Sequence, residues 1–172
     1  MAELGSAPVP APGDEDHRRG PAPGPDTPLI IVYADFECPY CAATELRLRE
    51  LPLHAVFRHF PVRSSHPRAW PAACAAEAAA SQGRFWEMHD ALFDDQARLA
   101  DPHLWARAHE LGLDLERFDA ERRDPATAER VKRDFRSGVR AGVVTTPTLF
   151  EWRDGAATRV DAAELMARLG GT

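Results

Sequence analysis

The spacing of apolar residues predicts alternating strands and helices from residue 29 onward. Residues 29–36 begin with five consecutive apolar side chains, Leu-Ile-Ile-Val-Tyr, which is typical of a strand buried on both faces. A mixed apolar and charged helix pattern follows and stops at Pro52, and residues 53–60 then alternate loosely, as a second strand does, before Pro61. Two strands joined by a helix indicate a parallel, right-handed βαβ unit.

Residues 63–142 contain helix patterns and no convincing strand. The Asp101-Pro102 and Asp124-Pro125 pairs are strong helix starts, because a capping carboxylate precedes a proline in the first turn. No period recurs, so the stretch is not a repeat array. The predicted helices cover residues 69–80, 84–93, 101–111, 114–122 and 125 to Gly138 or Gly142.

Strand character returns near the C-terminus. Residues 146–152 and 157–160 flank a turn at Asp154-Gly155, and Asp161 begins an amphipathic helix through Leu169. The predicted fold class is therefore α/β. A βαβ half (residues 29–62) and a ββα half (residues 143–172) enclose a helical insertion (residues 63–142).

The first 28 residues have a different composition. They hold seven of the fifteen prolines and four of the eleven glycines, with almost no large apolar residue. Such a segment buries too little surface to offset the entropy lost on ordering, so residues 1–28 are predicted to be a disordered tail.

Charge and hydropathy narrow the class of partner. The chain has 172 residues, of which 44% are hydrophobic and 28% charged, an ordinary balance for one globular unit. A net charge of -6 disfavours nucleic acid and anionic membrane as main partners. No apolar run is long enough to span a bilayer, and no apolar signal segment precedes Leu29, so we expect a cytoplasmic protein.

Two of the three cysteines form a Cys-x-x-Cys motif, Cys38-Pro39-Tyr40-Cys41, between the first predicted strand and helix. The motif alone is compatible with a redox pair, half of a zinc site or a structural disulfide. Zinc needs two further ligands, and the chain has no second Cys-x-x-Cys. We therefore predict a redox pair and no bound metal.

The two thiols should have different roles. A helix N-terminus stabilises negative charge, so Cys38 is predicted to be the attacking thiolate and Cys41 the resolving thiol. Pro39 suits the first turn, where its missing N–H costs nothing. Tyr40 cannot add positive charge as a histidine could, which predicts a less oxidising pair than strong oxidants have.

Three carboxylates near the motif are candidates to carry the proton of the resolving thiol: Asp35, Glu37 and Glu45. Solvated surface charge is the alternative for each of them. Cys74, in the alanine-rich helix, is expected to be a packed, inert thiol, and a second redox partner is the alternative.

In sequence order, four stretches of this chain resemble the DsbA-like family of thioredoxin-fold thiol:disulfide oxidoreductases. They are residues 33–41 (YADFECPYC), 57–61 (FRHFP), 83–93 (GRFWEMHDALF) and 146–150 (TPTLF). The resemblance implies a thioredoxin-like fold with a helical insertion. It also implies that Pro147 is a cis proline beside the thiols and that the backbone of Thr146 pairs with an extended substrate.

The chain departs from the family pattern at several positions. Thr145 stands where glycine is frequent, and Asp154-Gly155 replaces an Asn-Gly hairpin turn. A first edge strand is common in thioredoxin folds, but the proline-rich segment offers no candidate, so a sheet of four strands is expected.

The expected activity is disulfide exchange with protein or peptide thiols, without a bound cofactor, supported by glutathione or a thioredoxin-type recycling partner. Two alternatives remain from the sequence. Cys-Pro-Tyr-Cys also occurs in dithiol glutaredoxins, which suggests glutathione-coupled reduction. A non-catalytic module that senses redox state while docked to a larger partner is the other.

Overall fold

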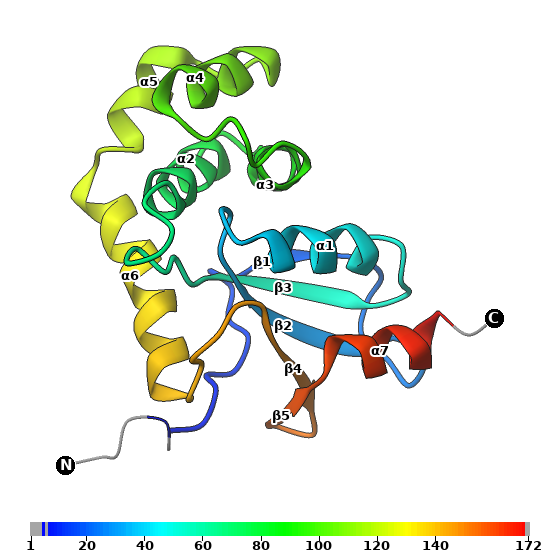
Figure 1. Cartoon of the computed structure of the whole chain (residues 1–172). Coiled ribbons are helices and arrows are strands. Elements are labelled where there is room, and N and C mark those ends of the chain that lie inside the picture. The colour runs from blue at the N-terminus through cyan, green and yellow to red at the C-terminus, as the bar shows by residue number, and fades with distance from the viewer. Residues whose placement is uncertain (1–4, 6, 171–172) are drawn as a thin grey trace.

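The structure, a computed structural model, describes residue 5 and residues 7–170 (Figure 1). In chain order the elements are β1 (His17–Arg19), β2 (Leu29–Ala34), α1 (Pro39–Leu48), β3 (His54–His59), α2 (Ala69–Ala80), α3 (Phe85–Asp94), α4 (Asp101–Glu110), α5 (Leu115–Glu121), α6 (Pro125–Arg140), β4 (Thr148–Arg153), β5 (Ala156–Val160) and α7 (Ala162–Leu169).

The strands form one five-stranded sheet in the order β1-β3-β2-β4-β5. Strands β2 and β3 are parallel, and α1 connects them, as the sequence predicts. The remaining neighbours pair antiparallel. Helices α2 to α6 all lie between β3 and β4 in sequence, so the predicted α/β class and helical insertion are both confirmed.

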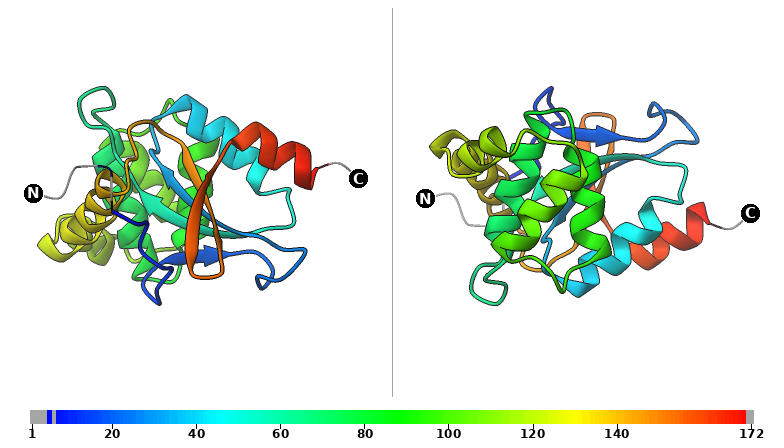
Figure 2. Two further views of the ribbon diagram at one scale, coloured as in Figure 1. Left: turned by 90° about the horizontal axis from the view of Figure 1, so that it is seen from below. Right: turned by 90° about the horizontal axis from the view of Figure 1, so that it is seen from above.

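The central strand β2 is buried on both faces. Ile30 and Val32 face one core cluster, whereas Ile31 and Tyr33 face the other, which follows from the two-residue period of a strand. Helices α1 and α7 lie next to each other along the first face (Figure 2), together with the bundle α2–α5.

The second face of the sheet is covered by the C-terminal half of α6. Gly138 permits a close approach, because a Cβ there would lie 2.7 Å from the Phe60 ring and 3.0 Å from Tyr33. The insertion therefore supplies part of the sheet's own core rather than standing apart from it. Among the helices of the described chain, none combines the length and apolarity needed to cross a bilayer.

The expectation of a disordered tail and a four-stranded sheet was wrong for the described part of the first 28 residues; residues 1–4 and 6 lie outside it. Residues 17–19 form β1, which pairs antiparallel with β3. Upstream, the carboxylate of Asp16 accepts two hydrogen bonds of 3.0 Å from the Arg58 guanidinium. The same guanidinium donates to the carbonyls of Pro10 and Ala11. A hydrophobicity argument missed this segment because polar contacts hold it in place.

Candidate active site

Cys38 is the N-cap residue of α1. Its backbone is extended (φ -76°, ψ 120°), and Pro39 follows in the first turn, where no hydrogen-bond donor is needed. The N–H of Cys38 donates to the carbonyl of Asp35 at 3.1 Å, which closes the turn between strand and helix. The predicted position of the first cysteine, at the positive end of the helix, is therefore observed.

The surroundings of Cys38 stabilise its thiolate. The hydrogen bond from the Cys41 thiol is the largest cause that lowers the pKa of Cys38 to about 5. The Thr146 side chain and the backbone N–H groups of Cys41 and Tyr40 act in the same direction and together outweigh burial. At neutral pH this sulfur is an anion and can act as a nucleophile.

Cys41 lies one turn further along α1 and is fully buried. Burial raises the pKa of Cys41 far above its ordinary value, and the hydrogen bond to Cys38 adds to the effect. The N–H of Asp35 donates to its sulfur at 3.4 Å. Both cysteines are free, so the structure holds one activated and one protonated thiol.

A second segment, remote in sequence, lies against the thiols. The Cys38 sulfur lies 3.4 Å from the carbonyl oxygen of Thr146, to which it donates a hydrogen bond in its protonated form. The Thr146–Pro147 peptide bond is cis, as the resemblance implies. Beside the two segments, Tyr40 and Val144 are 75% and 80% exposed, so each segment carries an apolar side chain open to solvent.

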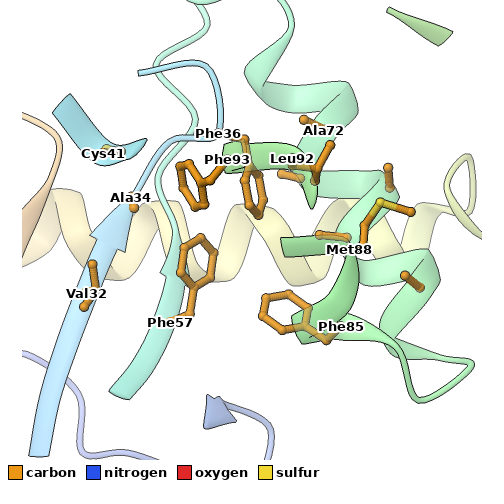
Figure 3. Close-up of a cluster of buried hydrophobic side chains, with 14 of the residues drawn as sticks. Val32, Ala34, Phe36, Cys41, Phe57, Ala72, Phe85, Met88, Leu92 and Phe93 are labelled. Atoms are coloured by element: carbon orange, nitrogen blue, oxygen red, sulfur yellow. The ribbon is translucent and has the colours of Figure 1, made fainter. Parts of the chain in front are cut away.

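The turn that precedes Cys38 is held from both sides. The Phe36 ring packs against Phe57 and Phe93, with ring centroids 5.4 and 4.8 Å apart (Figure 3). From the loop after α3, the amide Nε2 of Gln96 donates to the carbonyls of Phe36 and Cys38 at 2.8 and 2.9 Å. Gln96 carried no motif or periodic signal, and sequence reasoning missed it.

Asp35 connects the cysteine turn to the loop after β3. Its carboxylate accepts hydrogen bonds from the N–H of Glu37 at 2.8 Å and the N–H of Val62 at 2.7 Å. The Nδ1 atom of His66 lies 2.9 Å from the same carboxylate. Glu37 in turn accepts from the N–H of Arg68 at 2.5 Å. Two of the three proposed proton carriers are thus engaged in backbone contacts that shape the site.

Glu45, the third carboxylate, is buried in α1, one turn beyond Cys41. Its Oε2 lies 3.5 Å from the Arg19 guanidinium and 3.6 Å from Nε2 of His89. Burial raises the pKa of Glu45 to about 7. Among the hydrogen bonds of the described residues, none joins any of the three carboxylates directly to the Cys41 sulfur, so their role in proton transfer stays a prediction.

Cys74 is buried in α2, and burial together with the charge of Glu77 raises its pKa to about 11. Such a thiol is protonated and unreactive at neutral pH, in agreement with the expected inert role.

A hollow of about 1080 Å³ lies between the N-terminal segment and α6, and neither Cys38 nor Cys41 is among the residues that line it. Several of its arginines are paired with carboxylates: Arg130 with Asp134, Arg133 with Glu15, and Arg136 with Glu129. The activated thiol therefore lies outside this groove.

A family profile described as Thioredoxin matches residues 15–151. The chain therefore belongs to the thioredoxin family. It is 45% identical over 147 residues to a protein named Na(+)/H(+) antiporter NhaA 3 from Salinispora tropica, covering 83% of this chain and 22% of that protein. A Herminiimonas arsenicoxydans protein named Na(+)/H(+) antiporter NhaA is 46% identical over 142 residues, 78% of this chain and 22% of its own length. The chain thus spans about a fifth of the length of these curated relatives.

Solved structures agree on the fold. A thioredoxin-like oxidoreductase from Silicibacter pomeroyi matches with a TM-score of 0.73 and 22% identity, covering 90% of each chain. Pseudomonas aeruginosa DsbA2 matches with a TM-score of 0.71 and 23% identity, covering 91% of this chain and 94% of that one. The thioredoxin-like, DsbA-like fold predicted from the four sequence stretches is confirmed.

Proposed function

We propose that the chain is a thiol:disulfide oxidoreductase that exchanges disulfides with protein or peptide substrates through Cys38 and Cys41. The observation that carries the proposal is the contrast between the two sulfurs. One is an N-cap thiolate with its pKa near 5, and the other is a buried thiol. Solved neighbours of the same fold include one protein described as a thiol-disulfide exchange protein and another described as a thiol-disulfide oxidoreductase, which supports this class of activity.

The geometry supports a two-step exchange. In the reducing direction, the Cys38 thiolate attacks one sulfur of a substrate disulfide, which forms a mixed disulfide and releases the other substrate sulfur as a thiolate. Cys41 then loses its proton and attacks the Cys38 sulfur, which releases the second substrate thiol and leaves a Cys38–Cys41 disulfide. The same steps in reverse oxidise a dithiol substrate.

The burial of Cys41 determines the order of the two reaction steps. While Cys38 carries negative charge, a second thiolate beside it is strongly disfavoured, so Cys41 stays protonated. Formation of the mixed disulfide removes the Cys38 charge and also removes the thiolate that accepts the Cys41 hydrogen bond. The resolving thiol therefore becomes easier to deprotonate only after substrate has been captured.

Substrate binding is proposed at the Thr146-Pro147 segment. Because the Thr146 carbonyl lies 3.4 Å from the Cys38 sulfur, an extended chain that pairs with this backbone would bring its own sulfur to the nucleophile. The exposed Tyr40 and Val144 side chains offer apolar contacts on either segment. Binding of such a polypeptide requires no contact with a nucleic-acid base or sugar.

Relatives favour a second candidate, a redox-sensing module of a larger protein. The chain matches about a fifth of proteins named Na(+)/H(+) antiporters at 45% and 46% identity. In that setting the thiol pair would report redox state to a transport domain rather than turn over many substrates. The two roles differ in turnover and in how much the fold changes on oxidation.

Turnover on a disulfide protein separates the candidates. The enzyme should reduce insulin disulfides with dithiothreitol, or reoxidise a reduced protein with oxidised glutathione, over many cycles. Cys41→Ser should trap a mixed disulfide, and Cys38→Ser should not. Cys74→Ala is the matched control and should leave both Cys38 and Cys41 as reactive as in the parent. Stoichiometric reaction alone, with a large change in hydrogen exchange on oxidation, would favour the sensor.

Glutathione coupling and location are separate parts of the proposal. A glutaredoxin-like reductase would need glutathione for turnover, so paired assays with glutathione and with thioredoxin plus its reductase distinguish the two recycling routes. The cytoplasmic location expected from the sequence remains a prediction, which fractionation of cells that express the full-length native protein would test.

A further inference from the structure

Three side chains from different elements converge at the β1 edge of the sheet. His17 lies in β1, His59 at the end of β3 and Glu77 in α2. The Oε1 atom of Glu77 lies 2.7 Å from Nε2 of His17 and 2.6 Å from Nε2 of His59. All three ligand atoms lie within 4.8 Å of one another. This His-His-Glu cluster has no part in the thiol chemistry proposed above.

The atoms that converge are those a divalent transition metal prefers. Two imidazole nitrogens and one carboxylate oxygen form a three-ligand set known for zinc, which takes N and O ligands at about 2.0–2.2 Å in four-coordinate geometry. The present spacing places the nitrogens and the oxygen slightly closer together than ligands around an ion would lie. Tetrahedral ligands with these bond lengths lie about 3.3–3.6 Å apart, so each nitrogen–oxygen separation would increase by roughly 0.7 Å.

Only the solvent-facing side of the cluster, formed by His17 and Glu77, is exposed enough to allow that increase. The His59 side chain is 1% exposed, whereas those of His17 and Glu77 are 15% and 10% exposed. His17 also stacks on the Phe85 ring, with centroids 3.4 Å apart, which fixes the plane of its imidazole. An ion could therefore enter from solvent past β1 and keep a water in its fourth position.

The charge state of the cluster is compatible with a cation. Burial alone would raise the pKa of Glu77, but hydrogen bonds from His17 and His59 hold it well below its ordinary value, so the carboxylate is anionic. Two further groups interact electrostatically with Glu77. Arg130 is itself paired with Asp134, and the Cys74 thiol is neutral at pH 7 because its pKa is raised to about 11.

The Nδ1 atom of His59 affects how tightly the cluster would bind a metal ion. In the part of the chain that the structure describes, Nδ1 of His59 is buried without a hydrogen-bond partner. Metal ligation through Nε2 would put the proton on Nδ1, where no acceptor receives it, so nothing strengthens this ligand as a second hydrogen bond usually does. Binding should therefore be reversible and modest rather than of the zinc-finger strength.

We propose that His17, His59 and Glu77 form a binding site for one Zn²⁺ ion, with a fourth coordination position open to solvent. An occupied site would join the N-terminal strand to β3 and to the helical insertion. The sequence alone gives no sign of this site, because the three ligands lie 42 and 18 residues apart, without the local spacing of a zinc motif.

The test uses the full chain in a Cys38→Ser/Cys41→Ser background, because the active-site thiols are zinc ligands themselves. Titration with Zn²⁺ at pH 7.5 should give one equivalent bound, and Co²⁺ should give a visible absorption band typical of four-coordination. The thermal midpoint should rise with Zn²⁺ concentration.

Variants connect the binding to the cluster. His17→Phe keeps the stacking on Phe85 and removes a ligand, and Glu77→Gln keeps the shape and a hydrogen-bond acceptor. Each should weaken Zn²⁺ binding at least about tenfold, whereas His54→Ala, at another histidine of β3, should not. Circular dichroism without metal establishes that each variant folds. Binding weaker than about 100 μM, or equal binding by His17→Phe and the parent, would overturn the proposal.

Discussion

The Nδ1 atom of His66 lies 2.9 Å from Oδ2 of Asp35, the residue whose N–H donates to the buried Cys41 sulfur. Although partial burial acts against it, the Asp35 carboxylate and the charges of Cys38 and Glu37 raise the pKa of His66. The loop after β3 thus places an imidazole with a raised pKa within electrostatic range of Cys38. When protonated, this ring supplies some of the positive charge that Tyr40 cannot provide.

Replacing His66 should weaken that stabilisation. His66→Gln is expected to raise the pKa of Cys38 and to slow its alkylation at pH 5 by roughly two- to fivefold, with little change at pH 8. The measurement is the pH dependence of iodoacetamide reaction. His109→Gln, an exposed histidine of α4, is the control and should leave the profile unchanged. An identical profile in His66→Gln would remove His66 from the site.

The thiolate itself gives the most direct prediction. Because the pKa of Cys38 is about 5, its alkylation rate should be half-maximal near pH 5 and constant above pH 7. Cys41→Ser weakens the hydrogen bond that contributes most to this shift, so its midpoint should move to higher pH. Cys38→Ser should reduce fast alkylation to background. A midpoint near the ordinary cysteine value in the parent would contradict the mechanism.

Gln96 should matter for stability and for reactivity together. Gln96→Ala removes two hydrogen bonds to the turn before Cys38 and should lower the free energy of unfolding by about 1–2 kcal/mol. Gln82 is a matched control, since its amide also makes two backbone contacts, with Asp114. Only Gln96→Ala should also shift the pH profile of Cys38 alkylation; a shift in Gln82→Ala as well would argue against a specific role.

The raised pKa of Glu45 should make the free energy of unfolding depend on pH. Its pKa is raised to about 7 in the fold, so the folded chain binds this proton more tightly than the unfolded chain. The stabilisation is fully present below pH 4.5 and is lost as pH rises through 7, a change of about 3 kcal/mol at most.

Denaturation from pH 5 to pH 8 provides the measurement. The free energy of unfolding of the parent should fall relative to Glu45→Gln across this range. His89, whose pKa burial lowers to about 3, contributes to both proteins and largely cancels in the difference. Glu50→Gln, an exposed glutamate that follows the same helix, should run parallel to the parent. A constant difference for Glu45→Gln would mean that its carboxyl titrates normally.

The N-terminal segment is held by a buried ion pair. Asp16→Asn leaves the Arg58 guanidinium, whose side chain is 4% exposed, without its charged partner and should destabilise the fold by about 3 kcal/mol. Asp14→Asn, at an exposed neighbour, should change stability little. Urea unfolding of the two variants makes the comparison, and equal midpoints would mean that the segment contributes nothing to the fold.

Sequence patterns predicted the elements that carry a strong local signal. The apolar run at residues 29–33 indicated β2, and the alanine-rich stretch gave α2 with the observed bounds, Ala69–Ala80. Both cysteines and Thr146-Pro147 were also predicted to lie together. The two elements follow from local propensity, whereas the meeting of the cysteines with Thr146-Pro147 was implied by the resemblance to a known family.

The features that were missed have long-range polar causes. Strand β1 is only three residues long, His17–Arg19. It has no local apolar pattern, and its side chains instead form hydrogen bonds with residues of α2 and α3. Gln96 and His66 act from irregular loops, where neither periodicity nor propensity distinguishes a supporting side chain from a solvated one. Only the fold brings them to the thiols.

The pairing of β1 with β3 has a consequence for self-association. Without β1, the outer edge of β3 would present unpaired backbone groups beside the buried side chains of Val56 and Phe57. An apolar strand with a free edge is a template on which a second molecule can add a strand and begin aggregation. The charged residues Arg18 and Arg19 close this edge, so the short N-terminal strand also protects the chain against polymerisation through its own sheet.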